Sequence, residues 1–290
     1  MTISKAEEQK AGAMYTSPYM AEFYDVYWKD FFSTSQDNAV YANQLQIVRD
    51  QTPSNSPLLV LDVCTGSGRI IQGLTSRTQD ENDRKIHFIG LDIAEDMINR
   101  AQNLLPPTSE AAMTTSWVVG SALDMRTSLA AIIPKQKVDL ITIAFGSISH
   151  FHEDGQPEQF LREVAQLLRP GTGRAAISFV STFVNTDVPI CLPGETQTPE
   201  MPSKQFPGIY YQETALEPSA GNSVYLDRRE VAVIKVDSEG NRKVLSKQEV
   251  NTPFRMFSEE KIHAMVKQAG LRIVEIVTIP EEYIWVVQLL

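Results

Sequence analysis

The sequence predicts an α/β fold, in which helices cover a mostly parallel sheet. Short apolar runs alternate with helical patterns from Leu58 onward, at the interval typical of strand-helix-strand units. The runs are continuously apolar, as strands buried on both faces are. One intervening helix, expected over residues 157–168, has a single apolar stripe and ends at Arg169-Pro170-Gly171. Strands are expected at residues 58–63, 86–91, 117–119, 138–144 and 175–180.

The composition is that of an ordinary globular protein with an acidic charge balance. The chain has 290 residues, 42% hydrophobic and 21% charged, which suits one large domain with an appendage or two domains. No apolar run approaches the roughly 20 residues that span a bilayer, so no membrane partner is expected. The polar start of the chain predicts a cytoplasmic protein, in which Cys64 and Cys191 stay free thiols. The net charge of −10 disfavours a nucleic-acid partner and suits cationic or neutral small ligands.

The segment before the first strand is rich in aromatic side chains, with eight between residues 15 and 32. Tyr15 and Tyr19 begin a series at i+4 spacing, and a second series runs beside it, which predicts one broad aromatic face on a helix. Ser17 and Pro18 are typical of a helix N-cap and first turn, which leaves Tyr15 just outside the helix. This face either packs against the core or serves as a lid.

After residue 180 the pattern changes to that of antiparallel strands. Residues 181–208 hold five of the sixteen prolines and have no helical or strand period. Strands are then expected at residues 209–213, 224–236 and 243–252, with a hairpin turn at 237–241. A long loop of this kind often forms an active-site lid. The chain is expected to close with a helix capped by Ser258 and ended by Gly270, followed by a hairpin of residues 272–279 and 283–290.

The sharpest local signal is the run LVLDVCTGSGRI at residues 59–70, which indicates an apolar strand, an acid, a Gly-x-Gly turn and a helix. Such a turn lets a ligand approach bare backbone amides. In a dinucleotide fingerprint a third Gly or Ala would stand where this chain has Ile71. Asp62, four residues ahead of Gly66, would repel a pyrophosphate but attract an ammonium or sulfonium group. The motif therefore predicts a site for a cationic nucleoside.

A second acid follows the next expected strand. Asp92 comes 24 residues after Gly68, at a position where a carboxylate can hold ribose hydroxyls with both oxygens. Helix capping is the alternative for Asp92 taken alone, because another helical pattern begins directly after it. Taken together with Asp62, the ribose interpretation is favoured.

These motifs resemble those of class I S-adenosylmethionine-dependent methyltransferases, over about residues 55–180 and 257–290. The runs that carry the resemblance are LVLDVCTGSG, GLDIAEDMINRA, VVGSALDM and LREVAQLLRPGTGRAAISFV. The resemblance implies a Rossmann-like class I methyltransferase fold with a seven-stranded, mostly parallel sheet and a reversed C-terminal hairpin. Ser121 is a departure, because the family commonly has an acid directly after the glycine of this loop. Adenine recognition by Ser121, by Asp124 or by backbone is left open.

Within the family, the run AFGSISHF at residues 144–151 is similar to a loop of small-molecule N-methyltransferases of the sugar-amine and glycine types. Phe23-Tyr24-Asp25 and residues 254–259 resemble further features of those enzymes. The expected organisation is an N-terminal helical cap at residues 1–57, a cofactor-binding core at 58–180, an inserted antiparallel β lid at 181–256 and a C-terminal helix and hairpin at 257–290.

The resemblance implies S-adenosylmethionine as the cofactor and a small molecule as the methyl acceptor, with a homo-oligomer left open. For Cys64 the alternative is packing as a small hydrophobe. The residues expected to bind the cofactor are Tyr24, Asp62, Cys64, Gly66, Gly68, Asp92, Ile93, Met97, Ser121, Ala122, Leu123, Ala144 and Phe145.

Methyl transfer is an in-line displacement that needs alignment and exclusion of water rather than a covalent nucleophile. An amine must be neutral to attack, so His150 is the candidate base, with loop packing as its alternative role. Tyr19 is the second catalytic candidate, and with Tyr15 and Tyr24 it is expected to orient the acceptor or close over the cofactor. His150 and His152 lack a third ligand at useful spacing, so no metal is expected.

The favoured function is methylation of a small metabolite, first at nitrogen and otherwise at oxygen or sulfur. A relative of the fold that binds the cofactor without methylating, such as a cyclase, is the alternative. The charge disfavours a nucleic-acid methyltransferase, and Ile71 with Asp62 disfavours a dehydrogenase. Arg228, Arg229 and Arg255 either meet an anionic acceptor or, as the alternative, form salt bridges and solvated surface.

Overall fold

The structure is a computed structural model, which describes residues 15, 17–53, 56–78, 85–105, 113–133, 137–186 and 196–290. Cys191, expected to be a free thiol, lies outside these residues, whereas Cys64 is described and free. In the described part of the chain no helix is long and apolar enough to cross a membrane.

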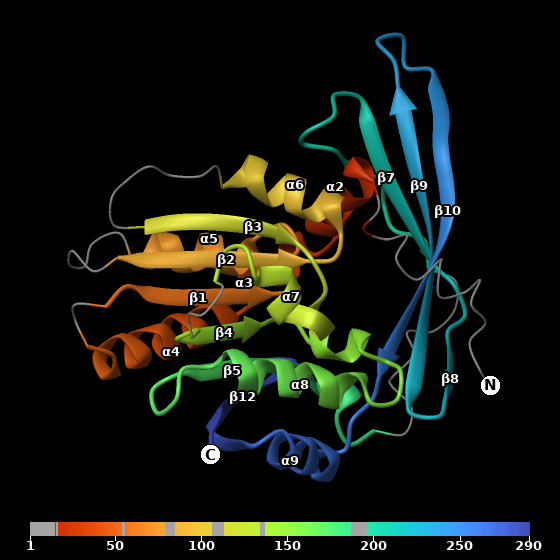
Figure 1. The fold of residues 1–290 in the computed structure, drawn as a ribbon. Helices are drawn as coiled ribbons and strands as arrows, with labels where there is room; N and C mark the ends of the chain where they lie inside the picture. Colours follow the sequence, from red (N-terminus) through yellow and green to blue (C-terminus); the bar gives the residue numbers. More distant parts are fainter. Residues whose placement is uncertain are drawn as a thin grey trace.

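A seven-stranded sheet forms the centre of the molecule (Figure 1). Its strand order is β11-β12-β5-β4-β1-β2-β3, and β12 runs antiparallel to both of its neighbours while the other pairs are parallel. The expected mostly parallel sheet with a reversed C-terminal hairpin is thereby confirmed. The strands are β1 (Leu58–Val63), β2 (Ile86–Asp92), β3 (Met113–Val119), β4 (Leu140–Ile143), β5 (Arg174–Val180), β11 (Leu271–Ile279) and β12 (Glu282–Leu289).

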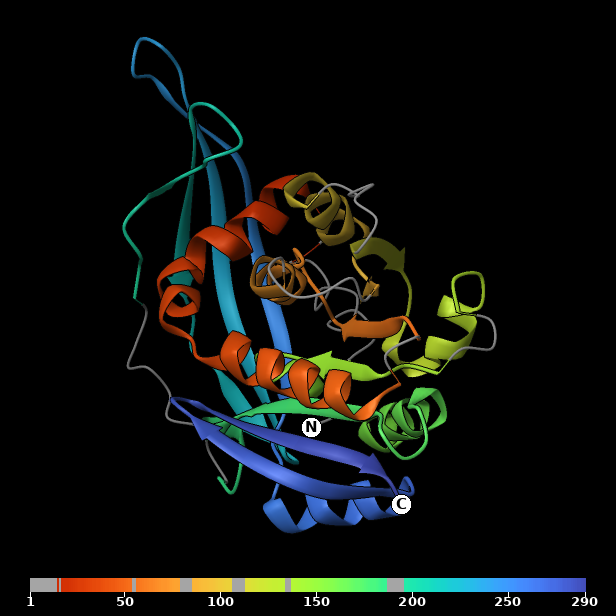
Figure 2. The same ribbon diagram turned by 90° about the vertical axis from the view of Figure 1, so that its left-hand side faces the viewer.

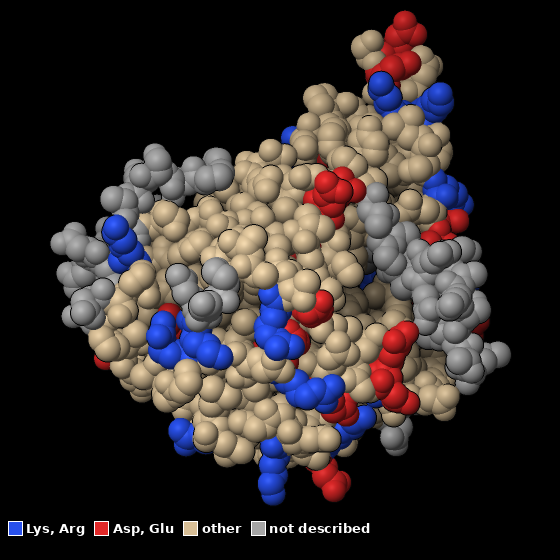
Figure 3. Space-filling model, in the orientation of Figure 1, with Lys and Arg blue, Asp and Glu red and all other residues tan. Residues whose placement is uncertain are grey.

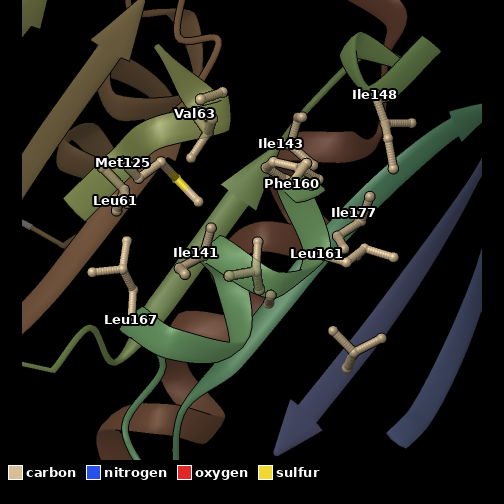
Figure 4. Packing of buried hydrophobic residues seen from close by; sticks show 14 of the residues in the cluster. Leu61, Val63, Met125, Ile141, Ile143, Ile148, Phe160, Leu161, Leu167 and Ile177 are labelled. Carbon is tan, nitrogen blue, oxygen red and sulfur yellow. The ribbon is translucent and has the colours of Figure 1, made fainter. Parts of the chain in front are cut away.

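Helices cover both faces of this sheet, because the strand residues alternate between two hydrophobic clusters. Leu59, Leu61 and Val63 of β1 face one cluster, and Leu58 and Val60 face the other. Figure 4 shows α8 side chains directed at β1, β4 and β5 within the first cluster. The helices of the first face are α7 (Met125–Leu129), α8 (Gln156–Leu167) and α9 (Glu259–Gln268), and those of the second are α4 (Asp37–Gln51) and α5 (Arg69–Thr78). Beside β2 and β3 lies α6 (Glu95–Leu104).

The aromatic N-terminal segment forms two helices rather than one, α2 (Pro18–Tyr27) and α3 (Lys29–Thr34). The expected N-cap is confirmed, since Met20 N donates to Ser17 Oγ at 3.1 Å. Trp28 separates the helices with φ and ψ of −88° and 5°. The break changes the direction of the chain, so the aromatic residues do not share one face. In Figure 2 these helices and α4 follow an arc around α5.

A second, antiparallel sheet stands across the carboxyl ends of the parallel strands (Figure 1). We call it the lid sheet; its order is β10-β9-β7-β6, and β8 pairs with β9. The expected hairpin turn is present, because Asp237 N donates to Asn241 O and Gly240 N donates to Asp237 O. The strands are β6 (Met201–Pro202), β7 (Ile209–Ala215), β8 (Ser219–Gly221), β9 (Val224–Val236) and β10 (Arg242–Arg255).

The lid sheet is fastened to the core through α2. Met20 and Phe23 of α2 pack with Tyr211 and Val231 of the lid sheet in a third hydrophobic cluster. At the end of this contact, the buried Glu22 carboxylate accepts hydrogen bonds from Tyr211 Oη and from the backbone amides of residues 204 and 205. Since α2 also lies against α6, this helix connects the lid sheet with the core near the carboxyl ends of the parallel strands (Figure 1).

Candidate functional site: a carboxylate-flanked glycine turn

The glycine turn between β1 and α5 brings backbone amides to the carboxyl edge of the sheet. Cys64, Gly66 and Gly68 all have positive φ angles, of 55°, 56° and 82°. A Cβ added at Gly68 would lie 2.5 Å from the ring of Trp117, so that position excludes a side chain. At Gly66 the nearest atom to an added Cβ is Met97 Cε, at 3.7 Å. The turn is therefore tightly packed at Gly68 and less confined at Gly66.

Asp62 is a fully buried carboxylate directly below this turn. Thr65 Oγ1 donates a hydrogen bond to its Oδ2 at 2.6 Å, and Thr142 Oγ1 donates to its Oδ1 at 2.7 Å. Burial raises the pKa of Asp62 to about 6, although both hydroxyl groups and Arg69 act in the other direction. At neutral pH the side chain is therefore ionised, and its charge is available to a cation in the site.

Asp92 combines the two roles that the sequence left open for it. Its Oδ1 accepts from Ala94 N at 2.9 Å, which stabilises the start of α6. Its Oδ2 accepts from Gly66 N at 2.8 Å, which ties the end of β2 to the glycine turn. Each carboxylate oxygen has a second lone pair, so this structural role leaves room for ligand hydroxyl groups. Burial raises the pKa of Asp92.

A pocket opens between this turn and the loop that follows β4. Six of the residues predicted from the sequence line it, namely Tyr24, Asp62, Cys64, Gly66, Ala144 and Phe145. Burial raises the pKa of the Cys64 thiol well above its usual value, which keeps it neutral. The remaining lining residues, which the sequence did not single out, are Phe32, Thr65, Ser67, Arg69, Ile70 and Ser147.

The other predicted cofactor residues lie around this pocket. Gly68 packs below the turn, and Met97 is buried beside Gly66. Ile93, which directly follows β2, is 75% exposed, and Val119, the last residue of the neighbouring strand β3, is 51% exposed. Apolar side chains this open at the edge of a site provide surface for a flat apolar ring.

Ser121, Ala122 and Leu123 follow β3 at the same edge of the sheet. Ser121 Oγ accepts a hydrogen bond from Leu123 N at 3.2 Å, and Ala122 is buried. Asp124 is exposed. Gly120 N donates to Asp92 O at 2.8 Å, which joins this segment to the second acid of the site.

The loop after β4 is locked into the site by aromatic rings of α3. Phe145 has a positive φ of 51° and lies within 5.0, 4.9 and 5.2 Å, centroid to centroid, of Trp28, Phe31 and Phe32. The three rings come from the break at Trp28 and from the short helix α3 that follows it. Behind the loop, Ser178 Oγ accepts from Gly146 N and donates to the buried Glu282.

Two charged groups of the N-terminal helices hold the glycine turn from above. Ser67 Oγ donates to Asp25 Oδ1 at 2.7 Å, and Asp25 also pairs with Arg100 of α6. Asp37, which is fully buried, forms a two-pronged ion pair with Arg69 at 3.0 and 2.6 Å. These pairs join residues 32 to 75 positions apart in the chain, so no local sequence signal identifies them.

His150 lies beyond the pocket, between Tyr15 and the lid sheet. Its ring is 6.3 Å from that of Tyr15 and 4.8 Å from that of Phe254 in β10. Burial, together with His152 nearby, lowers the pKa of His150 to about 4. The imidazole is therefore neutral at pH 7 and suited to accept a hydrogen bond, but it is a weaker base than a histidine with an ordinary pKa.

Tyr19, the second catalytic candidate, is directed elsewhere. Its ring packs against Phe206 of the lid unit at 4.7 Å, within the third hydrophobic cluster, and it does not line the pocket. Tyr15 is nearer the site, because its ring lies 5.8 Å from that of the pocket-lining Tyr24 and 6.3 Å from that of His150, although Tyr15 does not itself line the pocket.

The three arginines considered for an anionic acceptor are all paired with carboxylates. Arg228 pairs with Glu249, and Arg255 pairs with Asp154. Arg229 pairs with both Asp227 and Glu213. The salt-bridge alternative is thereby confirmed for the three side chains. On the face drawn in Figure 3, Lys and Arg side chains lie beside Asp and Glu side chains.

Comparison with known proteins agrees with this geometry. Residues 60–171 match the family model of a methyltransferase domain. The chain is 26% identical over 277 residues to a protein of Cladobotryum sp named N-methyltransferase FrzE, a match that covers 93% of this chain and 94% of that protein.

Solved structures share the fold at low sequence identity. An S-adenosylmethionine-dependent methyltransferase from Clostridium acetobutylicum superimposes with a TM-score of 0.65 at 15% identity, covering 92% of this chain and 98% of that one. The sugar N-methyltransferase KedS8 from Streptoalloteichus sp gives a TM-score of 0.61 at 17% identity, covering 92% of both chains.

The chain contains a methyltransferase domain at residues 60–171, and its fold and its glycine turn with two acids are similar to those of class I S-adenosylmethionine-dependent methyltransferases. Within that class it is similar to small-molecule N-methyltransferases.

Proposed function

We propose that the protein transfers a methyl group from S-adenosylmethionine to the nitrogen of a small-molecule amine. The observation that carries this proposal is the position of a neutral imidazole, His150, across Tyr15 and Tyr24 from a carboxylate-flanked glycine turn. The similarity to a protein named as an N-methyltransferase along 93% of the chain supports nitrogen as the acceptor atom.

The residues of the turn fit the cofactor. Asp92 has carboxylate lone pairs free for ribose hydroxyls, and an open backbone at Gly66 admits a close ligand. Ile93 and Val119 offer exposed apolar surface for the adenine ring. Asp62, ionised at neutral pH, attracts the positive charge of the methionine end.

When bound, the cofactor supplies a methyl carbon on a positively charged sulfur, which retains the electron pair of the broken bond and leaves as a neutral thioether. The chain has to align the acceptor and exclude water. Phe145 and Tyr24 line the space next to the turn, and Tyr15 closes it toward the lid sheet. His150 accepts a hydrogen bond from the neutral amine and so directs the nitrogen lone pair toward the methyl carbon. The proton of the methylated ammonium then passes to solvent.

The acidic charge of the chain supports a small-molecule acceptor rather than a nucleic acid, since net charge is −10. We also retain from the sequence the expectation of a cytoplasmic enzyme.

The test is incubation with S-adenosylmethionine carrying a ¹³C-labelled methyl group and a panel of amines, phenols, carboxylates and thiols, each on both a sugar and an aromatic body. We expect label on nitrogen, identified by its NMR shift, together with an equal amount of the demethylated product. Label on oxygen or sulfur only, or no transfer to any acceptor, would contradict the proposal. A His150→Gln variant is expected to lower kcat more than it raises the KM for the cofactor.

A further inference from the structure

A row of five rings leads from the cofactor pocket onto the lid sheet. It starts at Tyr15, next to Tyr24, and continues through His150, Phe254, Phe183 and Tyr225 with successive centroid distances of 6.3, 4.8, 5.1 and 5.9 Å. Phe183 and Phe254 are stacked, with an interplanar angle of 18°. Five segments of the chain contribute these side chains, so the row is formed only by the complete fold.

The outer four rings of this row do not belong to the hydrophobic core. None of His150, Phe183, Tyr225 and Phe254 is among the buried residues of the three described core clusters or among those packed against them. All four remain partly exposed. An aromatic surface of this kind at the entrance of a site, outside the core, is suited to contact a ligand.

The charged residues beside the row carry a negative balance. Tyr225, Asp227 and Arg229 alternate along β9 and therefore share one face of the strand. Arg229 pairs with Asp227 at 2.6 Å and with Glu213 at 3.2 Å, so two carboxylates surround one guanidinium. Both Asp227 and Arg229 are close enough to influence Tyr15 electrostatically. The cluster therefore attracts a cation approaching the row and repels an anion.

On the opposite side of the row, Arg255 follows Phe254 in β10. Its side chain is 4% exposed and is occupied by Asp154 and by the carbonyl group of His152. Each arginine in the described strands of the lid sheet therefore already forms an ion pair with a carboxylate. A phosphate or carboxylate on the acceptor would find no ready guanidinium partner here.

Resting on the proposed function, we propose that the methyl acceptor is an amine on a flat, apolar or aromatic body. The body of the acceptor lies against the row of rings, and its nitrogen is at His150, on the side of the row that faces Tyr15 and the cofactor pocket. Aromatic rings stack on such a body with little conformational cost. Within the row, an amino sugar would find polar atoms at Tyr15, His150 and Tyr225, but its other hydroxyl groups would lose water against the ring faces of Phe254 and Phe183. The net negative cluster at Asp227 draws the ammonium form toward the site before it loses its proton.

The experiment measures acceptor binding and methyl transfer separately. Tryptamine, phenethylamine, phenylalanine and glucosamine are titrated calorimetrically into the complex of the enzyme with the demethylated cofactor, S-adenosylhomocysteine, and kcat/KM is measured with S-adenosylmethionine. We expect tryptamine and phenethylamine to bind at least about tenfold more tightly than glucosamine and phenylalanine. Tighter binding of glucosamine or phenylalanine would overturn the proposal. Binding of the aromatic amines without methylation of any amine would instead contradict the proposed function and leave the acceptor class supported.

Two variants separate contact with the acceptor from a structural role. Phe254→Ala is expected to weaken tryptamine binding about tenfold, as the loss of one stacked ring does, with unchanged cofactor affinity. Phe206→Ala, a lid phenylalanine outside the row, is the matched control and should leave tryptamine binding within twofold. Equal effects of both substitutions would contradict the proposed position of the acceptor.

Asp227→Asn provides a second test, which compares the affinities for two ligands of different charge. A purely structural role of Asp227 would not change one affinity more than the other. Removal of one negative charge should weaken the binding of tryptamine, which is a cation, and should change the binding of phenylalanine, whose ammonium and carboxylate charges cancel, by less than about twofold. An equal loss of affinity for both ligands would show that the charge at Asp227 does not select the acceptor, and would overturn that part of the proposal.

Discussion

The two halves of the proposed site, one for the cofactor and one for the methyl acceptor, are built in different ways. The cofactor half consists of backbone amides and short side chains within a few residues of β1 and β2, such as Asp62, Gly66 and Asp92. The acceptor half consists of aromatic side chains such as Tyr15, His150 and Phe254, which come together from distant segments. The glycine turn with its two acids is specified by local sequence and the aromatic row by the tertiary fold, so the two are expected to respond differently to substitution.

The largest effect is expected at the acid that serves the cofactor half alone. Asp92→Ala removes the hydrogen bond from Gly66 N and the proposed hydrogen bonds from the ribose hydroxyls, each of them charge-assisted. The loss of about 3 kcal/mol raises the Kd for S-adenosylmethionine about 100-fold in calorimetry. Glu95→Ala, an exposed acid at the start of the following helix α6, is the control and should change Kd less than twofold. If both variants bind equally well, Asp92 does not hold the cofactor.

The pH dependence of cofactor binding tests the charge of Asp62. Its pKa of about 6 is raised above the usual value of 3.8, so the carboxyl group takes up a proton as the pH falls through 6. A cationic ligand favours the ionised form, and the Kd for S-adenosylmethionine should therefore rise about tenfold between pH 7 and pH 5. Neutral S-adenosylhomocysteine should show a smaller change. An equal pH dependence for both ligands would contradict the electrostatic role.

A smaller effect is expected from the contact that closes the cofactor half from above. Asp25→Ala removes the hydrogen bond from Ser67 and the pair with Arg100. The looser turn should raise the Kd for S-adenosylmethionine about fivefold, consistent with the loss of about 1 kcal/mol. Tryptamine affinity, measured with S-adenosylhomocysteine at saturation, should stay the same. Asp30→Ala in the exposed part of α3 serves as the control. A loss of tryptamine binding would indicate that the two halves are not separate.

The smallest effect is expected at the exposed edge of the site. Ile93→Ala removes apolar surface that the adenine ring would cover, which should weaken cofactor binding about threefold. Leu104→Ala, 47% exposed at the other end of α6, should have no effect. A similar change in both variants would place the adenine ring elsewhere.

The sequence predicted the parallel core well, because fully buried strands carry a strong apolar signal. The bounds of β1 agree residue by residue, whereas β3 begins four residues before the expected start at Trp117. The missed part, Met113 to Ser116, is at the sheet edge and contains polar residues that are only partly covered. The two short lid strands β6 and β8 were missed as well, because two or three residues establish no period.

For the site, residues that are close in the sequence were predictable, whereas contacts between distant segments were not. Asp62 and Gly66 are close in sequence, so their common pocket was predictable from spacing. The aromatic spacing also predicted a helical segment, but it predicted neither the break at Trp28 nor the contact of Trp28 with Phe145, more than 100 residues later. The sequence placed Tyr15 just before the helix and Tyr19 within it, but it did not show which of the two rings lies nearer the site. Only packing against Phe206 directs Tyr19 away from the pocket.

The most direct test is a crystal structure of the enzyme with S-adenosylhomocysteine and tryptamine. The account predicts that Asp92 holds the ribose, that the sulfur lies above the glycine turn, and that the indole lies along Phe254 with the amine facing His150. A nucleoside bound away from Asp62 and Asp92, or an amine that reaches the sulfur from a side other than His150, would contradict it.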